Sequence, residues 1–76
     1  MYEPGDYIKV EFHDEQNGES EWMWVNVTGS DDRQRVVFGT LDSEPIVMTD
    51  LRRGMELAVS YDNIRDHRKP ASFKPI

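Results

Sequence analysis

The chain has 76 residues, which is enough for one small domain and leaves no room for a second. Its 15 acidic residues outnumber its 9 lysines and arginines, so the formal net charge is -6. This balance disfavours a protein whose whole surface binds nucleic acid or an anionic membrane, because both partners demand positive charge. The absence of cysteine excludes disulfides, thiolate metal sites and thiol nucleophiles.

No apolar run approaches the roughly 20 residues that a membrane-spanning helix needs. No apolar segment typical of a secretory signal follows Met1. We therefore expect a cytoplasmic protein.

The apolar residues favour β-structure. Seven valines and eight aromatic residues stand against two alanines and three leucines, and β-branched and aromatic side chains suit a pleated surface. The nine glycines and prolines fall between the apolar runs, where turns need them. The composition predicts an all-β domain.

In chain order, a turn at 3–6 precedes a first predicted strand at 7–14, and a loop at 16–19 precedes a second at 21–28. Apolar residues alternate with others in both strands, so one face of each should point into the core. This predicted core face carries Ile8, Val10, Phe12, Met23, Val25 and Val27.

The third predicted strand is 35–41, where Gly39 indicates a bulge or a close approach of two backbones. A short edge strand is predicted at 46–48, a single helical turn near 49–53, and a last strand at 55–61. Residues 62–64 form a turn with room for a short 3-10 segment.

Five short strands without a long helix predict a small SH3-like barrel, with at most one helical or 3-10 turn near residues 49–53. The barrel domain is expected to span 1–66, and 67–76 to form an extended C-terminal tail.

The residues offer little to catalysis. No serine lies in a nucleophile-elbow motif, no glycine-rich phosphate loop is present, and paired acids such as Asp31 and Asp32 lie in a turn. The only histidines, His13 and His67, lack a helical partner and are expected to be solvated residues at strand ends rather than metal ligands. We expect neither an enzyme nor a bound cofactor or metal.

Three aromatic residues are candidates for a binding surface. If the alternating apolar residues face inward, Tyr7, Trp22 and Trp24 share the outer face of one sheet. Aromatic side chains dominate binding hot spots, so this face is a candidate for recognition of a protein partner. The alternative is that a tryptophan, Trp24 above all, covers an open end of the core.

Charge is unevenly distributed along the chain. Residues 1–32 hold nine acids against one lysine, a balance of -8, whereas residues 33–76 hold six acids against eight bases, a balance of +2. Such a separation can guide a charged partner, or it can serve solubility alone. The candidate charged binding residues are Asp14, Glu15, Glu19 and Glu21 on the acidic side and Arg52 and Arg53 on the basic side.

A set of short motifs resembles a known family. The set comprises residues 18–19, 21–25 (EWMWV), 39–42 (GTLD) with Glu44-Pro45, Leu51 with Gly54, and Ile64 with Asp66. Together they resemble the small bacterial proteins catalogued as domain of unknown function 2314, over residues 18–66. Met55 and the proline-containing tail depart from the family pattern. The resemblance implies a bacterial or phage cytosolic β domain and transfers no catalytic residues.

The leading hypothesis is a non-enzymatic module that recognises a protein partner of unknown identity. The second is an acidic inhibitor, such as an immunity or phage anti-defence protein, that blocks a basic nucleic-acid-binding or effector surface. The third is single-stranded nucleic-acid binding through the three aromatics with Arg52, Arg53 and Arg68, which the overall acidity disfavours. Self-association of the chain remains open.

Overall fold

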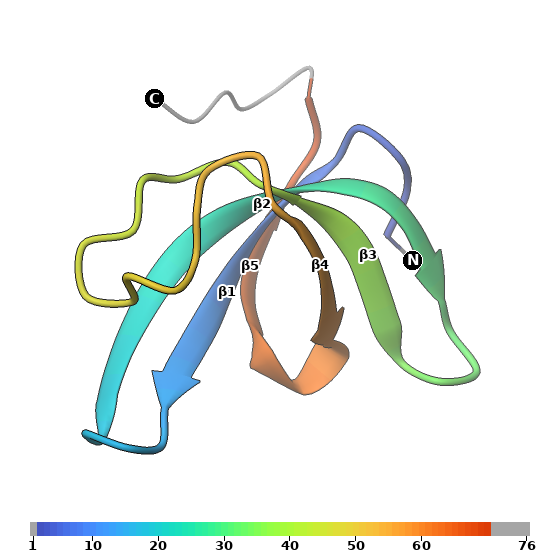
Figure 1. Cartoon of the computed structure of the whole chain (residues 1–76). Helices are drawn as coiled ribbons and strands as arrows, with labels where there is room; N and C mark the ends of the chain where they lie inside the picture. The colour runs from blue at the N-terminus through green and yellow to red at the C-terminus, as the bar shows by residue number, and fades with distance from the viewer. Residues whose placement is uncertain (1, 71–76) are drawn as a thin grey trace.

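The computed structural model describes residues 2–70, which form one five-stranded antiparallel sheet with the order β4-β3-β2-β1-β5 (Figure 1). The elements are β1 (Tyr7–Asp14), β2 (Glu19–Asp31), β3 (Val36–Leu41), β4 (Glu56–Ser60), the 3-10 turn η1 (Tyr61–Asn63) and β5 (Ile64–Arg68). The predicted all-β class is confirmed.

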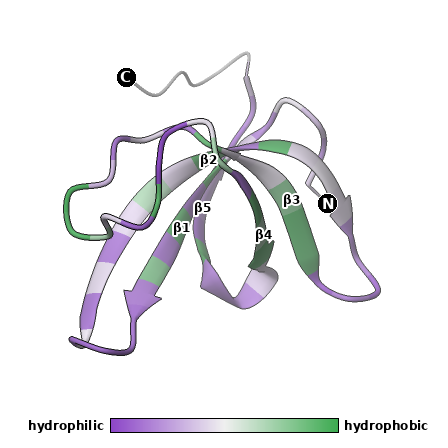
Figure 2. Ribbon diagram, viewed as in Figure 1, coloured by the Kyte–Doolittle hydropathy of each residue, from purple (hydrophilic) through white to green (hydrophobic). Residues whose placement is uncertain are grey.

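The core comes from the alternating apolar residues of the sheet. Five of the six residues predicted on the core face of the first two strands are buried, and Phe12 packs against them while half-buried. Figure 2 shows the resulting bands of apolar and polar colour along the strands. The buried apolar residues are Ile8, Val10, Met23, Val25, Val27, Val37, Leu41 and Val59.

β2 is the central strand and is shared between two parts of the sheet. Its residues 19–26 pair with β1 and its residues 25–31 pair with β3 (Figure 1). The register with β3 shifts between Val27 and Gly29, where the ladder bends. Opposite this bend, a Cβ on Gly39 would lie 2.4 Å from the carbonyl oxygen of Asn26. The predicted close approach of backbones at Gly39 is thus confirmed.

The predicted edge strand at 46–48 is wrong. The backbone N–H groups of Ile46, Val47 and Met48 all donate to the carboxylate of Glu21, at 2.8, 2.9 and 3.1 Å. Successive N–H groups of a strand point in opposite directions, so three consecutive donors converging on one acceptor require a curled backbone. This segment belongs to the loop between β3 and β4, residues 42–55.

The predicted helical turn near 49–53 is also absent. That segment forms two hydrogen-bonded turns, closed by Leu51 N–H to the Met48 carbonyl at 3.1 Å and Met55 N–H to the Arg52 carbonyl at 3.0 Å. The 3-10 turn lies at Tyr61–Asn63, which confirms the short 3-10 segment predicted around 62–64. The Ser60 hydroxyl accepts from Asp62 N–H at 3.1 Å and caps it.

The fifth strand is β5, a polar segment whose residues were predicted partly as a turn and partly as a tail. It pairs with β1, with Tyr7 opposite Arg68 and Lys9 opposite Asp66. The predicted boundary between domain and tail, after residue 66, therefore falls inside a strand. Residues 71–76 of the predicted tail lie outside the described part of the chain. Between residues 2 and 70, no helix has the length and apolar character that crossing a bilayer requires.

Candidate protein-binding surface

The outer face of β1 and β2 carries the three predicted aromatics. Tyr7 lies opposite Asn26, and Lys9 lies opposite Trp24 in the same register. Trp22 is two residues before Trp24, so both indoles point away from the buried face that holds Met23 and Val25. The prediction that these aromatics share the outer face is confirmed.

A lysine lies beside both tryptophans. The Nζ of Lys9 is 6.0 Å from the ring centroid of Trp22 and 5.4 Å from that of Trp24. Both distances allow cation–π attraction, which contributes about 0.5–1 kcal/mol at exposed sites. Lys9 was not among the predicted site residues, although its alternation with Tyr7 places it on the outer face. We call Tyr7, Lys9, Trp22 and Trp24 the aromatic strip.

The two tryptophans differ in exposure. Trp22 is 54% exposed, which is unusual for so large an apolar side chain. Trp24 is half-buried, and its backbone is fixed by the start of the β3–β4 loop: its N–H donates to the Ser43 hydroxyl at 2.9 Å, and its carbonyl accepts from Asp42 N–H at 2.8 Å. Trp22 is therefore available to a partner, whereas the Trp24 side chain is partly covered and its backbone anchors the start of the loop.

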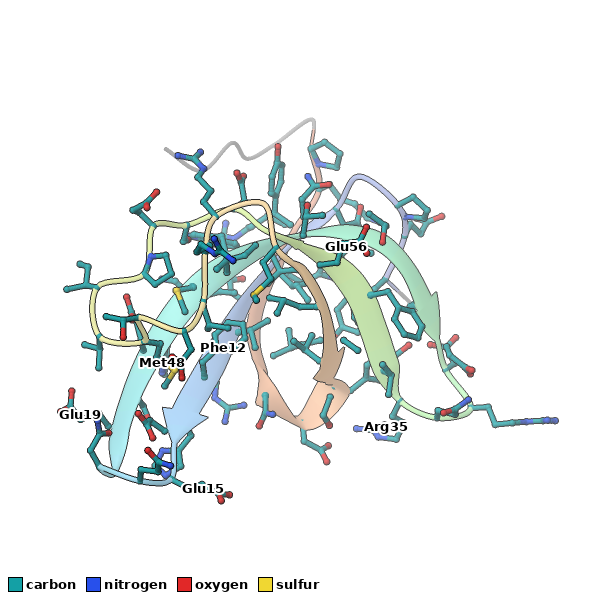
Figure 3. The ribbon with its side chains drawn as sticks, viewed as in Figure 1. Phe12, Glu15, Glu19, Arg35, Met48 and Glu56 are labelled. Atoms are coloured by element: carbon teal, nitrogen blue, oxygen red, sulfur yellow. The ribbon has the colours of Figure 1, made fainter. Side chains whose placement is uncertain are left out.

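The predicted acidic residues lie around the hairpin that joins β1 to β2, and they are not equivalent. Glu15 and Glu19 are exposed (Figure 3). Asp14 is half-buried, and one of its carboxylate oxygens accepts from Gln16 N–H at 2.9 Å, which shapes the turn. Within residues 2–70, none of these three carboxylates belongs to an ion pair.

Glu21 holds the backbone of the β3–β4 loop. Its carboxylate accepts the three N–H groups of residues 46–48. Burial alone would raise the pKa of Glu21, but these three donors outweigh it and hold the pKa below its ordinary value. The side chain predicted to contact a partner thus fixes the β3–β4 loop.

The predicted basic residues lie on the same loop. Arg53 pairs with Asp42 at 3.3 Å, and both side chains are substantially exposed. Arg52 is exposed and pairs with no carboxylate of the described residues. The loop therefore presents one unpaired cation rather than a basic patch.

A charge network around the buried carboxylate of Asp6 ties the N-terminal turn to β5. One carboxylate oxygen of Asp6 lies 2.7 Å from Nε2 of His67, 2.9 Å from Nζ of Lys69 and 3.1 Å from the N–H of Glu3. Asp6 is only 2% exposed. Burial alone would raise its pKa, but the bonds from His67, Lys69 and Glu3 outweigh burial and lower the pKa to about 2.

The two histidines are placed differently. His13 is exposed and bonds Ser20 through Nδ1 at 2.9 Å, as a residue near a strand end should be. His67 is half-buried against Asp6 and Tyr2, and the ring centroids of His67 and Tyr2 are 4.8 Å apart. The expectation of a solvated side chain was therefore wrong for His67. Among residues 2–70, no three histidine or carboxylate side chains are grouped as ligands for a metal ion.

An aromatic cluster shares Tyr2 with the Asp6 network, because the Tyr2 ring contacts both His67 and Tyr61. Tyr61 of η1 packs edge-on against Tyr2, with ring centroids 4.9 Å apart, and the guanidinium of Arg35 lies 5.3 Å from the Tyr61 ring. The Tyr61 hydroxyl donates to Asp32. This hydrogen bond is the main cause that raises the pKa of Tyr61, and partial burial of the hydroxyl is the second. These contacts join the β2–β3 turn to η1.

The fold defines a small antiparallel all-β domain with exposed aromatic and acidic side chains. The chain belongs to the family described as "uncharacterized protein conserved in bacteria (DUF2314)", whose model matches residues 4–72. The family resemblance predicted from the motifs is confirmed and extends over more of the chain than those motifs. No curated protein and no solved structure matches the chain.

Proposed function

We propose that this chain is a non-enzymatic protein-binding module whose recognition surface is the aromatic strip. The observation that carries the proposal is the 54% exposure of the Trp22 side chain beside Lys9. A large aromatic with its polar and cationic neighbours already in place loses little conformational freedom when a partner covers it. Tryptophan is also among the residues most enriched in binding hot spots.

The scaffold we propose for this module is a small SH3-like barrel. Support comes from the long, bent β2, which pairs with β1 through its first part and with β3 through its last part. The 3-10 turn between β4 and β5 returns the chain to pair with β1, on the other side from β2. Such an arrangement holds the strip on a rigid sheet rather than on a loop.

The test is affinity purification at moderate salt from a bacterium that encodes the chain, comparing Trp22→Ala with Phe38→Ala. Phe38 is the matched control because it is also an exposed aromatic in a strand, at 46% exposure. The same specific partner should be retained by the native chain and by Phe38→Ala, and lost with Trp22→Ala. Retention by Trp22→Ala combined with Tyr7→Ala, in a variant whose thermal unfolding is unchanged, would overturn the proposal.

An acidic inhibitor is the second candidate, and the ion pairs favour it over nucleic-acid binding. Of the eight lysines and arginines within residues 2–70, five already pair with carboxylates of the chain, namely Arg35, Arg53, Arg65, Arg68 and Lys69. The unpaired carboxylates Asp14, Glu15 and Glu19 gather at one hairpin. Binding that weakens steeply with salt and with neutralisation of these three acids would support inhibition of a basic surface.

A further inference from the structure

A groove separates the β1–β2 hairpin from the β3–β4 loop. It has a volume of about 700 Å³ and is lined by residues 12–17 on the hairpin side and 47–51 on the loop side. Figure 3 places Phe12 and Met48 close together between β1 and this loop, with Glu15 beyond them at the hairpin tip. The groove is distinct from the aromatic strip, because Phe12 belongs to the inward-facing side of β1.

The groove has an apolar floor and an acidic rim. Phe12 and Leu51 pack against the core while remaining half-buried, and Val47 and Met48 complete the apolar lining. The acids that line it are Asp14, Glu15 and Asp50, and none of them belongs to an ion pair within residues 2–70. Its described lining includes no lysine or arginine. The field inside the groove is therefore negative.

The loop wall of the groove is fixed before any partner arrives. The three N–H bonds to Glu21 hold residues 46–48, and the Leu51 N–H bond to the Met48 carbonyl closes the next turn. A wall held in this way loses less conformational entropy on binding than a free loop. Ile46, at the start of this wall, is 84% exposed and adds apolar surface beside the groove.

We propose that this groove binds a basic segment of a partner protein, with an arginine or lysine side chain entering between the hairpin and the loop. The methylene stem of such a side chain would cover Phe12 and Met48, while its charged end reaches Glu15 and Asp50. An apolar neighbour in the same segment would lie against Val47. The negative rim and the apolar floor together favour a segment that carries both a basic and an apolar side chain over an acidic or purely apolar peptide.

The test is an NMR titration of the ¹⁵N-labelled chain with a five-residue peptide amide that alternates leucine with arginine. The matched control peptide carries citrulline in place of each arginine, which keeps shape and removes charge. We expect saturable amide shifts confined to residues 12–17 and 47–51, and at least about tenfold weaker affinity for the citrulline peptide. The double variant Glu15→Gln, Asp50→Asn should weaken binding at least about fivefold, and Glu56→Gln, an exposed acid outside the groove, should leave it within about twofold.

Three results would overturn the proposal. They are no saturable shift at millimolar peptide, equal binding of the citrulline peptide, or shifts that gather on the indole N–H groups of Trp22 and Trp24. The last result would instead support the aromatic strip as the surface that binds the peptide. Loss of the strip's partner with Trp22→Ala does not affect this titration, so the two proposals fail independently.

Discussion

Removing the charge of Asp6 is predicted to destabilise the fold by a measurable amount. The folded-state pKa of Asp6 is about 2, against an ordinary value of 3.8. Because one pKa unit corresponds to about 1.4 kcal/mol, the ionised carboxylate contributes about 2 kcal/mol at pH 7. A domain of this size has a total stability of only about 4–10 kcal/mol. Asp6→Asn should therefore remove a large fraction of it.

The assay is urea unfolding followed by tryptophan fluorescence. With a slope of about 1 kcal/mol per molar urea, the midpoint of Asp6→Asn should fall by about 2 M at pH 7. The control is Asp62→Asn, which breaks an exposed pair with Arg35 and should change stability by less than about 0.5 kcal/mol.

The pH dependence gives the same prediction a second test. A lowered pKa means that this contribution is complete above pH 3.8 and disappears as the pH falls through about 2. The difference between the native chain and Asp6→Asn should accordingly be constant from pH 7 to about pH 5 and shrink towards pH 2. A midpoint shift below about 0.5 M, or a difference that is the same at pH 2 and pH 7, would show that the ionised Asp6 carboxylate does not stabilise the fold.

Three further predictions concern the loop, the bend of the sheet and high pH. Glu21→Gln should lower the free energy of unfolding by about 1–3 kcal/mol and abolish hydrogen-exchange protection of the amides of residues 46–48. Unchanged protection would show that the Glu21 carboxylate does not hold these N–H groups. Gly39→Ala should destabilise by at least about 2 kcal/mol in urea unfolding, because its Cβ would meet the Asn26 carbonyl, and an unchanged midpoint would show that the strands can part there. The Lys69 ammonium has its pKa raised above 10.5 mainly by its bond to Glu3 and next by its bond to Asp6, so its contribution to folding stability should persist up to pH 10.5 and be lost above it. Lys69→Met should remove this part of the fall in stability at alkaline pH. Identical alkaline stability profiles of the native chain and Lys69→Met would contradict this.

The alternation of apolar residues predicted most of the sheet. In β1 and β2 a buried face with a period of two leaves a clear pattern, and the core positions follow from it. The position of Trp22 on the outer face was predictable for the same reason. Gly39 was predictable as a point of close approach because glycine inside a strand run is otherwise unfavourable.

β5 and the β3–β4 loop could not be predicted in this way. β5 is a polar strand whose pairing with β1 is reinforced by contacts across long sequence separations, such as Arg65 with Glu11 at 2.9 Å. The curled segment 46–48 has the β-branched composition of a strand, but a carboxylate 25 residues upstream directs its N–H groups. The network of Asp6 with His67 joins residues 61 apart. Local patterns carry no signal for such pairs.

Photo-crosslinking at position 22 can show whether Trp22 lies within the surface that a partner covers. A photoreactive phenylalanine analogue placed at Trp22 keeps an exposed aromatic there, and the same analogue at Phe38 serves as the control. On irradiation in bacterial cells, we expect one discrete covalent adduct with another protein at position 22 and none at position 38. The absence of an adduct at position 22, or the same adducts from both positions, would show that Trp22 lies outside a partner-covered surface.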